Sequence, residues 1–235
     1  MKTLVLLVMI TFMSTQNAQA LTDESIVPIL KYDPHYHLDE HNHKISSEYL
    51  VVVPEETRFF KGSQKIRFER ALSILEDVLN SEEFKYRVLA YMRSSDGKRA
   101  YQKNYLWNNE DQRLSNEDVY ALIMEGNEYM RPNTFGEMNI NSYVKACRWY
   151  EEWKTWCRGV IGSTNPRSSK WIAQNWKFYK TYLTSQMVAN IVHEWLHLLG
   201  FLHGEVNMRE EVPYVVGSIA GQVAEEYLAA RGIAN

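Results

Sequence analysis

The strongest constraint on this chain is residues 184–199, whose apolar side chains would cover nearly the whole circumference of a helix. Such a pattern predicts a buried helix. His193, Glu194 and His197 are nevertheless set into it, and buried polar groups without partners are costly. Because His193 and His197 are four residues apart, both imidazoles emerge from one helix face. The fold must therefore supply partners for the two buried histidines and for the carboxylate.

A zinc ion would provide a partner for these side chains. Two imidazole nitrogens one turn apart can reach one zinc ion at about 2.0–2.1 Å. Gly200 can take the left-handed conformation that ends a helix, and the resulting turn would return His203 as a third ligand. Three neutral histidines leave a fourth position open, which is typical of catalytic zinc. We expect one catalytic zinc ion on His193, His197 and His203, with Glu194 as the general base toward a zinc-activated water.

The eleven residues from His193 to His203 follow the pattern HExxHxxGxxH and resemble the zinc helix of the metzincin metallopeptidases. A chance match to this pattern has a probability on the order of 10⁻⁵. The resemblance implies an α+β zinc metallopeptidase with a twisted, mostly antiparallel sheet, a backing helix, the active-site helix and a C-terminal helix. It assigns the backing helix to residues 66–79, a substrate-pairing edge strand to Trp171–Asn175 and the final helix to 217–230.

Metzincins place a methionine in a tight turn beneath the metal. Met208 follows His203 by only five residues, and residues 212–217 have the character of a turn that could serve without a methionine. Tyr214, within that turn, is a candidate oxyanion stabiliser because a phenol can donate a hydrogen bond to developing negative charge. The alternative, which is favoured, is a tyrosine that simply packs in the turn.

The expected substrate is a peptide or protein, but two other functions stay open: a zinc amidase acting on a non-protein amide, and a non-catalytic zinc-binding protein of the same fold. Glu194 argues against the second, because a site that only binds metal has no use for this carboxylate. The formal net charge of −3 and the pI of about 6.2 do not favour a nucleic-acid binder. The sequence does not indicate an oligomeric state.

The first twenty residues predict a secretory signal peptide, because a positive start precedes about ten apolar residues and the cleavage site at Ala18–Ala20. Leu21 is not a cysteine, so no lipid anchor is expected, and no later stretch has the roughly 18 consecutive apolar residues of a membrane span. A secreted or periplasmic protein follows. Residues 21–64 would form an N-terminal extension or a pro-segment, and residues 65–235 the catalytic domain.

A second histidine group comprises His35, His37, His41 and His43. Short His-rich tracts can bind metal, so this one could capture zinc or occupy the cleft as part of a pro-segment. A polar surface loop is the favoured alternative, because the spacing matches no defined coordination geometry. A cysteine-switch pro-segment is excluded, since no cysteine precedes Cys147.

Cys147 and Cys157 are either disulfide-bonded or both free, and export favours the bond. One continuous helix would separate them by roughly 15 Å, so a bond requires the chain to turn between them. The spacing of Trp149, Trp153 and Trp156 nevertheless predicts a helix over 141–156, with a stripe of core aromatics favoured over a carbohydrate or membrane platform. Other expected elements are a helix over 115–124, a strand or helix end at 88–92, and strands at 160–162 and 171–175 around a turn at 164–169.

Overall fold

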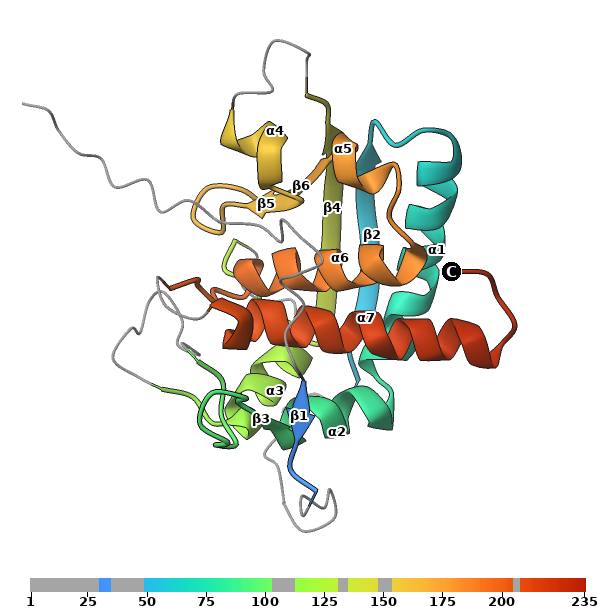
Figure 1. The fold of residues 1–235 in the computed structure, drawn as a ribbon. Coiled ribbons are helices and arrows are strands. Elements are labelled where there is room, and N and C mark those ends of the chain that lie inside the picture. Colours follow the sequence, from blue (N-terminus) through green and yellow to red (C-terminus); the bar gives the residue numbers. More distant parts are fainter. Residues whose placement is uncertain (1–29, 35–48, 103–112, 131–134, 148–153, 205–207) are drawn as a thin grey trace, which may run out of the picture.

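The computed structural model describes residues 30–34, 49–102, 113–130, 135–147, 154–204 and 208–235. Residues 1–20, with the expected signal peptide, and the histidines from His35 to His43 lie outside these ranges. The described chain has a mixed α/β fold, in which helices pack against a twisted sheet (Figure 1). No helix among the described residues is long and apolar enough to cross a membrane.

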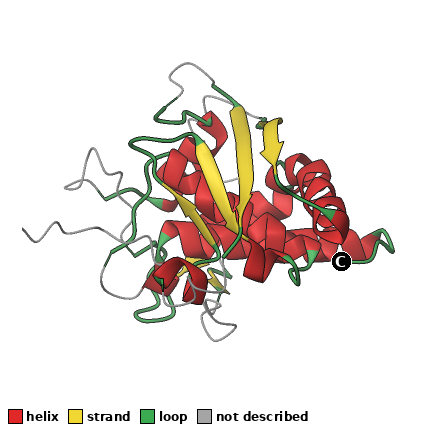
Figure 2. Cartoon of the chain, turned by 90° about the horizontal axis from the view of Figure 1, so that it is seen from above, coloured by secondary structure: helices red, strands yellow, loops and turns green. Residues whose placement is uncertain are grey.

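Four strands form the main sheet (Figure 2), in the order β2 (Val51–Arg58), β4 (Glu137–Lys145), β6 (Trp171–Asn175) and β5 (Gly162–Thr164). β2 pairs with β4 in parallel, β4 pairs with β6 in parallel, and β5 alone is antiparallel to its neighbour β6. The expected mostly antiparallel sheet is therefore wrong. Parallel neighbours need long, usually helical, crossovers. The described residues between β2 and β4 form three helices: α1 (Gly62–Leu79), α2 (Glu82–Ala90) and α3 (Asn116–Glu125).

The expected strand at Trp171–Asn175 is present as β6, but its assignment to the sheet edge is wrong. β4 lies on one side of β6 and β5 on the other, so β5 forms this edge. β5 spans Gly162–Thr164 rather than residues 160–162, and the turn that follows it covers residues 166–168. The other edge strand, β2, lies within the segment assigned to an N-terminal extension, so the folded unit begins before residue 65.

The expected helix over 141–156 is wrong. β4 continues to Lys145, and the short helix α4 (Thr155–Gly159) begins only after a change of direction. Cys147 and Cys157 form a disulfide with a Cα–Cα distance of 5.7 Å, which a continuous helix could not allow. Trp149 and Trp153 lie outside the described residues.

Other predicted elements are confirmed with small shifts. α1 contains the expected helix over 66–79, although Ile66 is exposed rather than in the core. α3 starts with the expected capping box, in which Ser115 and Asp118 bond each other's backbone amides. Residues 88–92 contain both a helix end and a strand, the two alternatives expected there. α2 ends at Ala90, and β3 (Tyr91–Met92) pairs with β1 (Lys31–Tyr32).

Three helices pack together on the sheet. α6 (Thr184–Leu198) contacts α1, β5 and β6, and α7 (Val212–Ala230) lies along α6 (Figure 1). The short α5 (Trp176–Tyr179) follows β6 directly. The expected turn at 212–217 is wrong, because these residues form the first turns of α7. Pro213 suits this position, since a proline near the start of a helix loses no intrahelical hydrogen bond.

Glycines allow α7 to approach α6 closely. A Cβ atom on Gly217 would lie 2.8 Å from the Ala189 carbonyl oxygen and 3.1 Å from Cβ of His193. A Cβ atom on Gly221 would lie 2.9 Å from Cβ of Ala189. This close contact brings the start of α7 beside the histidines of α6.

Candidate metal centre

α6 buries the chemically informative residues. His193, Glu194 and His197 are only 1%, 2% and 5% exposed, as the apolar circumference of the segment predicts. The helix ends as predicted at Gly200, which has a φ of 103°. The amide of Gly200 donates to the His197 carbonyl oxygen (2.9 Å) and that of Phe201 to the Leu196 carbonyl oxygen (3.1 Å). These bonds satisfy the last carbonyl groups of the helix and reverse the chain.

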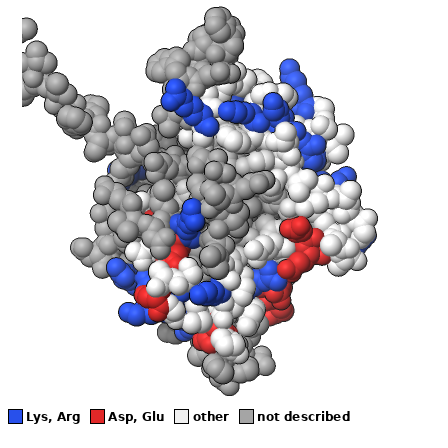
Figure 3. Space-filling model, viewed as in Figure 1, with Lys and Arg blue, Asp and Glu red and all other residues white. Residues whose placement is uncertain are grey.

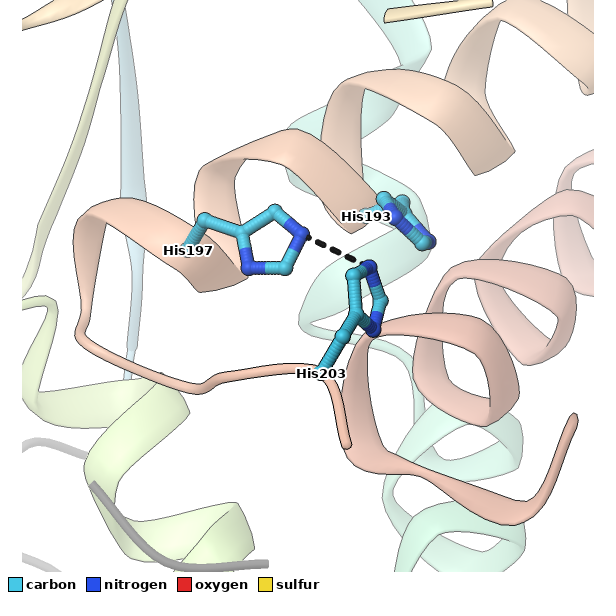
Figure 4. Close-up of side chains that lie close together, drawn as sticks. All are labelled: His193, His197 and His203. Carbon is cyan, nitrogen blue, oxygen red and sulfur yellow. Dashed lines mark hydrogen bonds between the residues drawn. The ribbon is translucent and has the colours of Figure 1, made fainter. Parts of the chain in front are cut away.

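The reversal brings His203 back to the two histidines of α6 (Figure 4). One ring nitrogen from each of His193, His197 and His203 lies within 4.8 Å of the others. Nε2 of His197 and Nε2 of His203 are 3.1 Å apart. Two nitrogens bound to one tetrahedral zinc at about 2.0–2.1 Å would be separated by roughly 3.3 Å. The structure thus brings together the three histidines that the sequence predicts as ligands.

In His197 and His203, the hydrogen-bond partner of Nδ1 determines which ring nitrogen carries the proton. Nδ1 of His197 is 2.7 Å from the Phe201 carbonyl oxygen, and Nδ1 of His203 is 2.9 Å from Oε2 of Glu211. Both partners are acceptors, so each Nδ1 carries the hydrogen and donates it. Each Nε2 then presents a lone pair, and the two lone pairs face each other at 3.1 Å. A cation between them would turn this repulsion into coordination, so the residues present fit a metal ion.

Burial also favours the neutral, metal-binding form of the rings. Desolvation lowers the pKa of His197 to about 3 and that of His203 to about 4, and for His197 the neighbouring His203 adds to the effect. Burial, followed by the neighbouring His197 and His203, holds the pKa of His193 well below its usual range, although the Pro213 carbonyl opposes this shift. Nδ1 of His193 is buried and, by geometry, makes no hydrogen bond with any described residue.

Glu194 lies against the edge strand β5. A Cβ atom on Gly162 would lie 2.5 Å from Oε1 of Glu194, so only glycine leaves room for this carboxylate. Oε2 of Glu194 is buried and has no hydrogen-bond partner among the described residues. Burial raises the pKa of Glu194 to about 8. The nearby Thr164 hydroxyl opposes that rise, although it does not form a hydrogen bond with Oε2 of Glu194. A buried carboxylate without a bond to Oε2 is placed to exchange a proton with a bound group.

Sequence reasoning missed Glu211. This residue is fully buried and precedes α7, yet its side chain does not cap that helix. Instead, Oε2 accepts from Nδ1 of His203 and Oε1 accepts from the Gly204 amide at 2.7 Å. A carboxylate that orients a metal-binding histidine in this way raises its basicity. The only signal in the sequence was a glutamate two residues before Pro213.

Tyr214 lies beside the histidine rings. In the first turn of α7, its ring centroid is 4.7 Å from that of His193 and 4.8 Å from that of His203. Burial raises the pKa of its phenol. These contacts agree with the packed-tyrosine alternative, and a role in oxyanion stabilisation stays a prediction. Met208 begins the 3-10 helix η4 (Met208–Glu210), but its side chain lies outside the described residues.

No family model, curated protein or solved structure matches this chain in comparisons with known proteins.

Proposed function

We propose that this protein is a secreted, zinc-dependent metallopeptidase of the metzincin type that hydrolyses peptide bonds. The observation that carries the proposal is the pair of Nε2 lone pairs of His197 and His203, 3.1 Å apart with both Nδ1 atoms occupied by acceptors. A metal ion between the two nitrogens would relieve the repulsion of these lone pairs, and His193 completes a three-nitrogen set. A set of three histidines with an open position is typical of catalytic zinc.

When bound, the zinc ion supplies Lewis acidity, which polarises a carbonyl group and makes water more acidic. The residues of the chain have separate tasks in this scheme. His193, His197 and His203 hold the ion, and Glu211 keeps the His203 ring in the orientation and tautomer that expose Nε2. None of these four side chains needs to change its protonation state during the reaction.

Glu194 performs the proton transfers. In its ionised form, which the charge of a bound cation would favour, a carboxylate oxygen of Glu194 accepts a proton from the attacking water, whose oxygen bonds to the carbonyl carbon of the substrate. The same carboxyl group then donates this proton to the amide nitrogen as the C–N bond breaks. The products are a free carboxylate and a free amine, and Glu194 returns to its starting state. Its buried Oε2, without a hydrogen-bond partner among the described residues, supports this role.

The edge of the sheet beside Glu194 offers a place for the peptide. β5 pairs only with β6 among the described strands, and Gly162 at its start contacts Glu194. An extended peptide can add to such an edge through main-chain hydrogen bonds. This role therefore moves from Trp171–Asn175, where the sequence placed it, to β5.

The test compares three forms of the purified protein: wild type, His197→Ala and Glu194→Ala. We expect about one zinc ion per chain in wild type and Glu194→Ala by elemental analysis, and loss of zinc in His197→Ala. On a mixed peptide library, only wild type should produce new amino termini. Zinc in wild type with equal activity in Glu194→Ala would refute the proposed mechanism. Folded wild type that takes up no zinc would refute the metal centre itself.

A further inference from the structure

Three buried polar atoms beside Gly162 make no hydrogen bond with any residue that the structure describes. They are Oε2 of Glu194, Oγ1 of Thr164 and Nε2 of Gln174. The first is a carboxylate oxygen, which accepts hydrogen bonds, and the other two belong to groups that donate them. Buried polar groups are almost always paired in native proteins, so a set of unpaired donors beside an unpaired acceptor requires an explanation.

The strand β5 brings these three side chains together. A Cβ atom on Gly162 would lie 2.5 Å from Oε1 of Glu194, so this face of the strand points at the carboxylate. Thr164 is two residues further along β5, and its side chain therefore leaves the same face. Gln174 of β6 pairs with Gly162, and residues directly opposite each other share a face of the sheet. Both donors thus flank the space that the missing side chain of Gly162 leaves to Glu194.

Asn190 holds Gln174 in place. It lies on α6 one turn before Glu194, and its Nδ2 donates to Oε1 of Gln174 (2.6 Å) and to the Tyr179 hydroxyl oxygen (3.1 Å). Because Oε1 of Gln174 accepts this bond, Nε2 is the atom that stays available as a donor. The same Nδ2 would lie 2.8 Å from a Cβ atom on Gly162, so this buried network reaches the space beside the carboxylate.

Burial makes Glu194 dependent on such donors. Figure 3 shows acidic side chains at the surface of the molecule, where water supplies their hydrogen bonds. The Glu194 side chain is buried, so its donors have to come from the protein. Burial, the larger effect, raises the pKa of Glu194, and the Thr164 hydroxyl opposes that rise. The hydroxyl is therefore close enough to act on the carboxylate.

We propose that Thr164 and Gln174 are positioning residues, whose hydroxyl and amide donate to the Glu194 carboxylate in the zinc-loaded protein and orient it toward the attacking water. This inference rests on the proposed function and adds to it the groups that hold the general base. Hydrogen bonds to a carboxylate are about twice as strong as those between neutral groups. A reacting group displaced by about 1 Å can lose about 100-fold in rate.

The experiment measures kcat and KM of the zinc-loaded full chain on one peptide that wild type cleaves. Thr164→Val keeps the shape of the side chain and removes its donor, so kcat should fall about tenfold or more while KM and zinc content stay unchanged. Thr164→Ser returns the hydroxyl and should restore most of kcat. Gln174→Met removes the amide and should also lower kcat. If Thr164→Val does not fold, Thr164→Ala takes its place.

Thr184→Val is the matched control. Thr184 is also a buried threonine, and its hydroxyl makes no hydrogen bond within the described part of the chain. It begins α6 ten residues before Glu194, which is about 15 Å along the helix. Thr184→Val should retain the kcat, KM and zinc content of wild type, because the same chemical change is then made away from the base.

An infrared measurement observes the carboxylate without turnover. The Glu194 bands are isolated as the difference between each zinc-loaded protein and the same protein with Glu194→Gln. These carboxylate bands should differ between wild type and Thr164→Val, because a hydrogen bond is lost. They should coincide in wild type and Thr184→Val, since a purely structural effect of losing a buried hydroxyl does not reach Glu194.

The outcomes separate the two proposals. Wild-type kcat in Thr164→Val or in Gln174→Met would overturn the role of that residue and leave the peptidase function standing. A loss of kcat that Thr164→Ser does not restore would also overturn the role of the hydroxyl. If zinc-loaded wild type cleaves no peptide of the mixed library, the proposed function fails. Unchanged carboxylate bands in Thr164→Val would then overturn the positioning inference as well.

Discussion

Glu211→Gln should weaken metal binding without removing a ligand. The glutamine has nearly the same size but only one oxygen, so it can accept from the Gly204 amide or from Nδ1 of His203 but not from both, and it carries no charge. Loss of a carboxylate partner of a metal-binding histidine typically raises the metal dissociation constant about 10–100-fold. That range corresponds to about 1.4–2.7 kcal/mol of binding free energy. Since Glu211 is fully buried and 2.9 Å from Nδ1 of His203, the upper half of this range is expected.

The assay is a competition for zinc between the protein and a chromophoric chelator of known affinity at constant pH. Glu210→Gln is the matched control, because Glu210 is also buried but accepts from Ser94 and Ser95 rather than from a histidine. The control should lose stability and keep the wild-type zinc affinity. Folded Glu211→Gln with an unchanged zinc dissociation constant would refute the orienting role of Glu211.

Three further predictions follow from contacts described above. Gly162→Ala should retain zinc but lose at least tenfold in turnover, because the added methyl group displaces the Glu194 carboxylate; normal turnover on a peptide would contradict this placement. Gly217→Ala should lower the free energy of unfolding in urea by about 1–3 kcal/mol, since α7 must move away from α6, and an increase would show that helix propensity outweighs the contact. In metal-free protein, the thermal midpoint should fall between pH 6.5 and 4.5, because the unfolded chain then binds protons at His197 and His203 that the fold, with pKa values of about 3 and 4, does not. Glu194, with a pKa of about 8, stabilises the fold as the pH falls through this window, so a net fall of the thermal midpoint reflects the histidines. A thermal midpoint that does not change with pH would contradict the burial of the histidines.

The histidine cluster could be predicted because its geometry is local. The spacing from His193 to His197 and the glycine at position 200 depend only on helix geometry and on the permitted φ of glycine. Glu211 and Tyr214 could not be placed in this way, because their contacts depend on the path of α7 against α6. That path follows from Gly217 and Gly221, whose effect appears only once the two helices are packed.

The sheet was harder to predict because strand direction is a tertiary property. β4 is almost entirely buried, yet Asn139, Asn141 and Ser142 interrupt its apolar pattern. The tryptophan spacing beyond it imitated a helix, and β5 has only three residues, too few for a periodic signal. Of the two alternatives for Cys147 and Cys157, the disulfide is present, because the chain turns between β4 and α4.

The three candidate ligands all fall within eleven consecutive residues, His193 to His203. An unfolded chain can therefore wrap the same short stretch around an ion without any help from the sheet or α7. A ligand that also binds the unfolded state stabilises the fold by less than its native dissociation constant suggests. Zinc should thus protect this protein against heat less than an equally tight ion held by distant residues would.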